Sequence, residues 1–180
     1  MDKKHYILTS LTLGLIGASS ALLVGGANLL TNERIKENEV KKINDGIATI
    51  FGKESKVEKT ESKEEAKLSK EYKYTNTIYT VVKNGGESYS GYAIRTLGSN
   101  MYGKISLIIG YEESSKAFLG LTIVTNEQTY ASTLVDNYIN PLNNDDIDVE
   151  DVKCGATYGA KLVRDMVLEA KEVALELWGK

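Results

Sequence analysis

A long uncharged segment near the N-terminus is the feature that most constrains how this chain can fold. No charged residue occurs between Tyr6 and Leu30, where Leu, Ile, Ala, Gly, Ser and Thr predominate. A helix of about 20 mainly apolar residues spans the hydrocarbon core of a bilayer, and a slightly longer one spans it with some tilt. We therefore expect residues 1–30 to form a short flank and a transmembrane anchor.

A cleaved signal peptide is the alternative interpretation of this segment. Lys3 and Lys4 would be its basic region, and Ala18-Ser19-Ser20-Ala21 would be its small-residue cleavage region. The apolar run, however, continues to Leu30, beyond the usual apolar length of a signal. The segment also contains no Cys for lipoprotein processing. These observations favour a retained, single-pass anchor.

Small residues recur along one face of the expected anchor. Gly17, Ala21 and Gly25 occupy every fourth position, which is the spacing that allows membrane helices to pack closely. We therefore interpret this face as a docking surface for other membrane helices.

Two segments of different character follow the anchor. Thr31–Phe51 carries Ile at roughly helical spacing, and Thr31 or Asn32 could cap a helix there. Lys53–Glu71 contains six Lys and six Glu but little that is apolar, so that it cannot bury enough surface to form a core. We expect residues 31–71 to be a membrane-proximal helix followed by a solvated helix or mobile connector.

Alternation of apolar residues indicates β-structure from residue 72 onward. Four runs rich in β-branched residues and Tyr predict strands, and turn-forming residues separate them. The predicted strands are Tyr72–Val82, Tyr89–Leu97, Lys104–Tyr111 and Ala117–Thr125, with turns at Asn84–Gly86, Gly98–Asn100 and Glu112–Ser115. An antiparallel sheet is the simplest arrangement of these strands.

Helical patterns complete a domain over residues 72–180. Ala131–Ile139 predicts a short helix that ends near Pro141. Tyr158–Trp178 predicts an amphipathic helix whose apolar face can cover the sheet. The expected fold class is α+β, with an N-terminal transmembrane helix followed by an antiparallel sheet covered by helices.

The segment Asp151-Val152-Lys153-Cys154-Gly155-Ala156-Thr157, which leads into the last predicted helix, has the character of an anion-binding site. Gly155 and Ala156 leave almost no side chain in front of the backbone, so that a phosphate could approach the helix N-terminus. Unpaired N–H groups and the helix dipole favour an anion there, and Thr157 presents a hydroxyl at the same place. A helix N-terminus without any ligand is the alternative interpretation.

This segment resembles the Asp-x-x-(Ser/Thr)-Gly-Ala-Thr pattern of the FMN-binding domain family. Its members include the G subunit of Rnf-type ion-translocating electron transport complexes and the C subunit of the sodium-pumping NADH:quinone oxidoreductase. In that family the last Thr carries FMN through a phosphoester bond, which a separate flavin transferase installs from FAD. The resemblance implies that Thr157 is the attachment point, that Gly155 and Ala156 allow close approach, and that the transferase recognises Asp151.

The chain departs from the family pattern around this motif. Cys154 stands where the family has Ser or Thr, and Gly159 stands where a second Ser or Thr usually follows. Cys154 and Tyr158 nevertheless flank the expected attachment segment, and the resemblance implies that both contribute to cofactor binding. Residues 30–35, 91–93 and 103–111 also look like the corresponding parts of the family, so the resemblance extends over much of the chain.

The loop after the last predicted strand is a further departure. Family members carry a Glu-Thr-Pro-Gly-Leu-Gly loop against the flavin, whereas this chain has Asn126-Glu127-Gln128-Thr129, in which only Glu127 and Thr129 match. The resemblance places both residues at the flavin site, where Glu127 would hydrogen-bond a ribityl hydroxyl or a ring edge. Tyr130 could stack on the isoalloxazine ring.

Composition argues against several other functional classes. His5 is the one His and Cys154 the one Cys, so the globular part can build neither a Cys-His or Ser-His nucleophile pair nor a zinc or c-type haem site. There is no Walker-type phosphate loop or dinucleotide fingerprint. A formal net charge of -3 without a basic stripe is atypical of nucleic-acid binding.

An acidic run precedes the motif. It lacks the Gly and the terminal Glu spacing of a calcium loop, so we interpret it as a solvated loop, with transient magnesium binding during flavin transfer as the alternative. Its members are Asp145, Asp146, Asp148, Glu150 and Asp151.

These patterns together predict a membrane-anchored electron carrier with covalently attached FMN, most like the G subunit of an Rnf-type complex. The expected partners are the other membrane subunits of such a complex and, during maturation, the flavin transferase. The resemblance implies an extracytoplasmic C-terminal domain, although the count of Lys and Arg at the two ends of the anchor favours the opposite orientation. The alternatives are a stand-alone extracytoplasmic flavinylated carrier and a divergent scaffold subunit that has lost its flavin.

Overall fold

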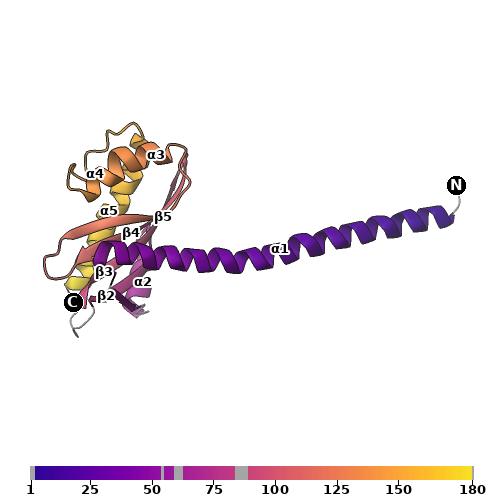
Figure 1. Ribbon diagram of the computed structural model, residues 1–180, viewed down its shortest axis with the longest axis horizontal. Coiled ribbons are helices and arrows are strands. Elements are labelled where there is room, and N and C mark those ends of the chain that lie inside the picture. Colours follow the sequence, from indigo (N-terminus) through magenta and orange to yellow (C-terminus); the bar gives the residue numbers. More distant parts are fainter. Residues whose placement is uncertain (1–2, 54, 59–62, 84–88, 180) are drawn as a thin grey trace. The chain divides into compact units, whose positions relative to one another are not determined.

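The chain divides into two compact units, Met1–Lys41 and Lys42–Lys180. The computed structural model describes residues 3–53, 55–58, 63–83 and 89–179. The described part of the first unit is entirely helical, whereas the second unit holds a sheet and its covering helices (Figure 1). An apolar N-terminal helix and an antiparallel sheet with helices confirm the predicted α+β class.

Helix α1 (Lys3–Phe51) begins in the first unit and ends in the second. Its stretch Tyr6–Asn28 has a mean hydropathy of 1.9 and is long and apolar enough to cross a membrane. The prediction of a new helix capped at Thr31 or Asn32 is wrong. Thr31 lies inside α1, where its hydroxyl donates to Ala27 O at 2.7 Å. A Thr hydroxyl that donates to the carbonyl of the preceding turn has its hydrogen bond within the helix and does not interrupt it.

Five antiparallel strands form a single sheet in the order β1-β2-β3-β4-β5, so that each strand pairs with its neighbour in sequence. The four predicted strands are confirmed as β2 to β5, and a fifth strand is added at one edge. The strands are β1 (Ser55–Glu58), β2 (Thr75–Lys83), β3 (Tyr89–Asn100), β4 (Gly103–Glu112) and β5 (Phe118–Asn126).

The charged segment after α1 is more ordered than its composition predicts. It contributes β1, which pairs with β2, and helix α2 (Lys63–Glu71), in which Leu68 is only 1% exposed. Leu68 joins the apolar core cluster that the sheet and α5 build, and α2 packs on β2.

The turn between β3 and β4 also lies later than predicted. Gly98–Asn100 continues β3, and the chain reverses at Met101 and Tyr102. The predicted turn at residues 84–86 falls outside the described residues.

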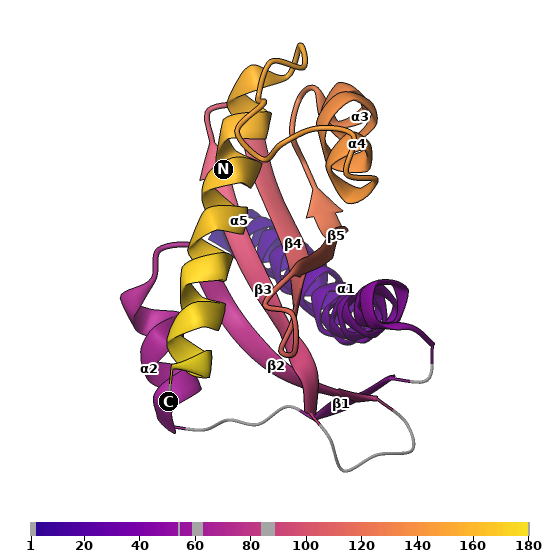
Figure 2. The same cartoon turned by 90° about the vertical axis from the view of Figure 1, so that its left-hand side faces the viewer.

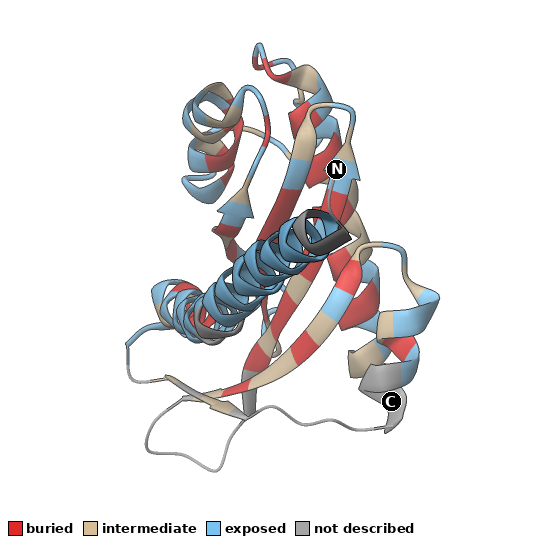
Figure 3. Ribbon diagram, turned by 90° about the vertical axis from the view of Figure 1, so that its right-hand side faces the viewer, coloured by how far each residue is buried: buried red, intermediate tan, exposed pale blue. Residues whose placement is uncertain are grey.

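Helix α5 (Thr157–Trp178) covers one face of the sheet, as predicted (Figure 2). Its buried residues pack on alternate residues of the strands, such as Ile94 on β3 and Leu107 and Ile109 on β4. The Tyr111 hydroxyl donates to Val167 O at 2.9 Å and joins the sheet to the middle of the helix. The central strand β4 is buried without a break from Ile105 to Tyr111, because helices lie on both faces of the sheet (Figure 3).

The last turns of α1 cover the opposite face of the sheet. Ile43, Ile47 and Phe51 pack with Val81 and Ile108 in a second apolar cluster. The sheet is therefore covered on both sides within the unit Lys42–Lys180.

A short helical segment after β5 packs beside the first turns of α5. It consists of α3 (Ala131–Leu134), a π-helical turn (Val135–Ile139) and α4 (Asn140–Asn143). The predicted helix Ala131–Ile139 is present, and the helical segment ends at Asn143, two residues beyond Pro141. Pro141 lies at the start of α4, a position that tolerates proline, directly after the π-helical turn.

Candidate functional site

The loop that leads into α5 is held in place by core packing and by a hydrogen bond at Cys154. Cys154 is 8% exposed and belongs to the apolar core. Its carbonyl accepts a hydrogen bond from Asn137 Nδ2 at 3.2 Å. Gly155 follows with φ of +82°, a left-handed conformation in which a side chain would be strained. The glycine therefore turns the chain sharply from the core into the first turn of α5.

The N-terminus of α5 is open to an acceptor. Ala156 is its N-cap residue and makes no side-chain capping hydrogen bond, and no acidic residue occurs in the first turn. First-turn N–H groups have no intrahelical acceptor, and the helix dipole adds a partial positive charge. Thr157 is the first helical residue and is partly exposed. A hydroxyl thus lies where the backbone favours an anion.

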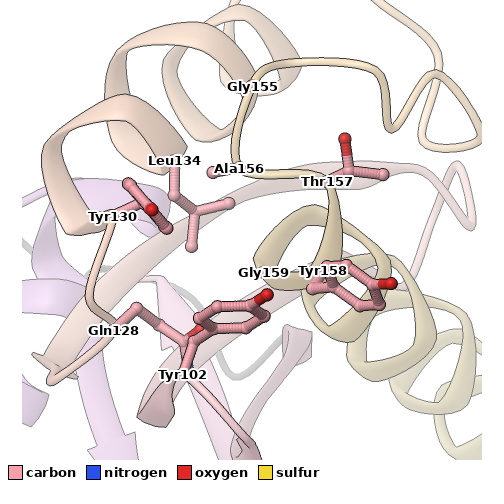
Figure 4. Close-up of a pocket in the computed structure, with 9 residues that line it drawn as sticks. All are labelled: Tyr102, Gln128, Tyr130, Leu134, Gly155, Ala156, Thr157, Tyr158 and Gly159. Carbon is pink, nitrogen blue, oxygen red and sulfur yellow. The ribbon is translucent and has the colours of Figure 1, made fainter.

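A pocket of about 350 Å³ lies in front of this helix N-terminus. Three separate segments line it: the β3–β4 turn, the region from the end of β5 into α3, and the start of α5. The lining residues are Tyr102, Gln128, Tyr130, Leu134, Gly155, Ala156, Thr157, Tyr158 and Gly159 (Figure 4). None of the nine is charged, so recognition depends on aromatic and aliphatic contacts and on hydrogen bonds.

Three tyrosines form the aromatic side of the pocket. The Tyr102 ring centroid lies 5.5 Å from that of Tyr158 and 6.1 Å from that of Tyr130, with tilted planes in both pairs. Tyr130 and Tyr158 are 54% and 60% exposed. The two outer rings thus have large accessible faces on which a planar ligand could stack. Thr157 stands at the rim, with its hydroxyl directed away from these rings (Figure 4).

Asn100 connects the aromatic side of the pocket to α5. Its Nδ2 donates to Tyr158 O at 3.1 Å, and its Oδ1 accepts from the Tyr102 backbone N–H at 2.8 Å. One side chain therefore fixes the position of the β3–β4 turn relative to the helix N-terminus. The sequence indicates only a turn-forming residue at this position.

Gly159 allows α5 to approach α3 closely. A Cβ atom at this position would lie 3.0 Å from Leu134 Cδ2, which is closer than most such contacts. Gly159 and Leu134 together close the inner end of the pocket. The departure from Ser or Thr at residue 159 thus has a packing explanation.

The structure brings together part of the predicted site. Gly155, Ala156, Thr157 and Tyr158 line the pocket, as does Tyr130.

The other predicted site residues do not line it. Cys154 is turned into the core, and Asp151 is exposed in the loop. Glu127 is exposed, and Thr129 Oγ1 donates to Tyr102 O at 3.1 Å. Thr129 therefore supports the turn that carries Tyr102, whereas Glu127 does not line the pocket.

Sequence reasoning missed Tyr102, Gln128 and Leu134 as pocket residues. Tyr102 lies in an ordinary tight turn, and Leu134 follows a helical apolar pattern. Gln128 lies between Glu127 and Thr129 but matches no residue of the family's loop. Only its position between two matching residues offered a signal.

The acidic run before the motif forms an exposed loop in which Glu150 pairs with Arg164 at 3.5 Å. Within the described ranges, no three His, Cys, Asp or Glu side chains are grouped as metal ligands.

Comparison with known proteins leaves the site to be interpreted from its own geometry. No protein-family model matches the chain, and a search of curated proteins finds no match.

Proposed function

We propose that this chain is a membrane-anchored electron carrier that holds FMN through a phosphoester bond to Thr157. The observation that carries the proposal is the position of Thr157, on an uncapped helix N-terminus at the rim of a pocket walled by three tyrosines. The pocket volume of about 350 Å³ falls within the range of small-molecule sites. Its lining combines apolar and aromatic walls with backbone N–H groups suited to a phosphate.

Each part of the site has a role in this proposal. The first-turn N–H groups of α5 and the bare backbone of Gly155 accommodate the phosphate. Tyr130 and Tyr158, which line the pocket with Leu134, would contact the faces of the ring, and Leu134 would exclude water from its inner edge. FMN supplies the ability to exchange one or two electrons, while the protein positions the ring and adjusts its potential through nearby dipoles.

Attachment of FMN requires no base from this chain. The Thr157 Oγ attacks the phosphorus on the riboflavin side of the FAD diphosphate, and an O–P bond forms as the anhydride P–O bond breaks. AMP leaves with the electron pair, and a base of the flavin transferase takes the hydroxyl proton. An unactivated Thr hydroxyl is a weak nucleophile, which explains the need for the transferase. The partial exposure of Thr157 leaves the hydroxyl accessible to it.

In-gel flavin fluorescence after denaturation tests the attachment. The full chain is coexpressed with a flavin transferase, and wild type, Thr157→Ala and Thr157→Ser are compared. We expect a fluorescent wild-type band, a dark Thr157→Ala band and a band of retained fluorescence for Thr157→Ser, which keeps the hydroxyl.

Thr133→Ala is the matched control, because Thr133 Cγ2 lies 3.3 Å from the Cβ position at Gly155 and yet has no proposed bond to FMN. A dark wild-type band would contradict the carrier and favour the scaffold alternative. A fluorescent Thr157→Ala band would place the attachment at another residue.

The proposal includes the membrane anchor, an extracytoplasmic C-terminal domain and assembly into an Rnf-type complex. The length and hydropathy of Tyr6–Asn28 support the anchor, and the small-residue face of Gly17, Ala21 and Gly25 supports helix contacts in the membrane. Copurification with several multi-spanning membrane subunits would support the complex. A solitary flavinylated protein would instead support the stand-alone carrier.

A further inference from the structure

Gln128 is a buried polar residue at the inner end of the pocket. Only 6% of the residue is exposed, although it lines the pocket. Its Nε2 donates to Gly103 O at 2.5 Å, and its backbone N–H donates to Asn126 Oδ1 at 3.1 Å. Neither of these hydrogen bonds uses the side-chain oxygen, Oε1. Oε1 is not among the atoms buried without a partner, and Gln128 lines the pocket, so this oxygen is available to accept a hydrogen bond from a bound molecule.

The orientation of the Gln128 amide is determined by its surroundings. Gly103 O is an acceptor only, so that the NH₂ group must face it, and the reversed amide would place two oxygens against each other. Gly103 itself is constrained, since its φ is +132° and a Cβ there would clash with the backbone at Glu127. The backbone at the start of β4 thus holds the donor side of the amide, and the acceptor side faces away from it.

The free oxygen is directed toward the start of α5. Gln128 Oε1 lies 3.5 Å from the Cβ position at Gly159, and both residues line the pocket (Figure 4). Because residue 159 has no side chain, nothing from α5 fills the space beside this oxygen. A carbonyl or phosphate placed there would be repelled, whereas an N–H or O–H group would be bound.

We propose that Gln128 determines which ring the pocket accepts, by taking a hydrogen bond from the ring N–H of the flavin. The oxidised isoalloxazine has a single ring N–H, between two carbonyl groups of its pyrimidine part. This inference rests on the proposed function, because it takes the ligand to be a flavin. It assigns the pyrimidine edge to the inner end of the pocket, beside Gln128, and the ribityl phosphate to the rim, beside Thr157.

Binding of lumiflavin and of N3-methyl-lumiflavin to the full chain tests the assignment. Both probes lack the ribityl phosphate, so that binding does not depend on Thr157. The protein is expressed without a flavin transferase, and dissociation constants are obtained from quenching of flavin fluorescence. We expect wild type to bind lumiflavin about tenfold more tightly than the methylated probe, the equivalent of one hydrogen bond.

The same pair of probes with Gln128→Met completes a double-mutant cycle. Methionine has a similar length but no strong acceptor, so Gln128→Met should bind the two probes with about equal affinity. A steric effect of the methyl group alone would leave the tenfold preference intact in Gln128→Met and would overturn the proposal. Glu127→Gln is the control, because this exposed neighbour does not line the pocket, and its preference should equal that of wild type.

The outcome is separable from that of the attachment test. Equal binding of the two probes by wild type, or no binding of either, would overturn the role of Gln128 even if the denatured band is fluorescent. A dark band together with a tenfold preference that Gln128→Met abolishes would refute covalent attachment and support the role of Gln128.

Discussion

Glu169 shows how a carboxylate comes to occupy the sheet-facing side of α5. The sequence places it in the same helical row as Leu162, Met166 and Val173. In the structure its carboxylate accepts hydrogen bonds from the backbone N–H groups of Lys73, Tyr74 and Thr75, at 2.7 to 3.1 Å. Thr75 Oγ1 also donates to it at 3.0 Å. The charge is thus satisfied by the two residues before β2 and by its first residue, Thr75.

We predict that Glu169→Ala lowers the free energy of unfolding by about 1–2 kcal/mol, because it leaves the partly buried donors of a charge-assisted cluster without their acceptor. Urea denaturation of the full chain measures the change. Glu172→Ala, at an exposed position of the same helix, should change stability by less than about 0.5 kcal/mol. Equal effects of the two substitutions would show that the cluster at β2 contributes nothing specific.

Cys154 and Gly159 illustrate why a change of residue type near a motif need not mean loss of a site. Cys154 replaces an expected hydroxyl residue but faces the core, where a thiol behaves as a small apolar group. Gly159 accommodates Leu134. Both substitutions are explained by the packing behind the pocket wall, and neither removes Thr157 from the rim.

At the scale of elements, α1 and β5 are joined by an unusually close contact. A Cβ atom at Gly46 would lie 2.5 Å from Thr122 Oγ1. Thr122 is β-branched and sits on a strand, so its side chain has little freedom to move aside. The glycine therefore sets how closely the last turns of α1 approach the sheet.

We predict that Gly46→Ala destabilises the chain by about 1–2 kcal/mol, because overpacking outweighs the roughly 1 kcal/mol that Ala gains over Gly in a helix. In a Thr122→Ala background, the same substitution should be neutral or stabilising, since the clashing oxygen is gone. Thermal or urea unfolding of the four proteins of this cycle measures the coupling. Additive effects would mean that the helix does not rest on Thr122.

The outer edge of β5 is protected by a side chain rather than by another strand. Asn143 Oδ1 accepts from Leu121 N–H at 2.8 Å, and Asn143 Nδ2 donates to Leu121 O at 2.9 Å. One amide side chain thus occupies both backbone groups that a neighbouring strand would use. Blocking of an edge in this way opposes pairing between chains, and it also attaches α4 to the strand that leads into the pocket loop.

At the scale of the whole molecule, buried tyrosines link stability to alkaline pH. Burial raises the pKa of Tyr111 well above its ordinary value of 10.0. Burial likewise raises the pKa of Tyr138, although the positive charge of Arg164 opposes this effect. Both hydroxyls donate to carbonyls, Tyr111 to Val167 and Tyr138 to Val149. The neutral phenols are therefore favoured in the folded state.

We predict that these two groups stabilise the fold fully below about pH 10 and that their contribution is lost as the pH rises further. The folded state holds a proton that the unfolded state releases above its pKa near 10, so the free energy of unfolding falls with pH there. Urea denaturation between pH 8 and 11 measures the slope. Tyr111→Phe and Tyr138→Phe should each make the slope shallower, and the double variant most of all. A double variant with the wild-type slope would assign the alkaline loss to other groups.

Much of the fold follows from local patterns in the sequence. The apolar run near the N-terminus, the four alternating segments and the amphipathic helix at residues 157–178 each carry their period within a short window, and each is present in the structure. The start of the second helical stretch was predicted wrongly. The sequence predicted a cap at Thr31 or Asn32, whereas α1 continues through both residues, because a capping preference of about 1 kcal/mol does not interrupt a helix that is favourable on both sides.

β1 and the buried Leu68 of α2 could not be predicted from composition. Their segment is dominated by Lys and Glu. Leu68 becomes buried, and Val57 half-buried, because the sheet offers them an apolar surface. Such burial depends on the partner and not on the segment. In the same way, Glu169 can lie on the core-facing row of α5 because another segment supplies donors for its carboxylate, such as the Tyr74 N–H.

The sequence by itself determined the chemistry at residues 155–157: a flexible glycine, a small alanine and a hydroxyl at the start of a helix. Only the tertiary structure decided what faces them. Tyr102, Gln128 and Leu134 come from three places in the chain and meet Thr157 through the register of β3 with β4 and the packing of α3 on α5. The physical reason is that residue type and helical period are local properties of the sequence. A pocket forms only when the sheet and its helices assemble and bring residues from distant parts of the chain together.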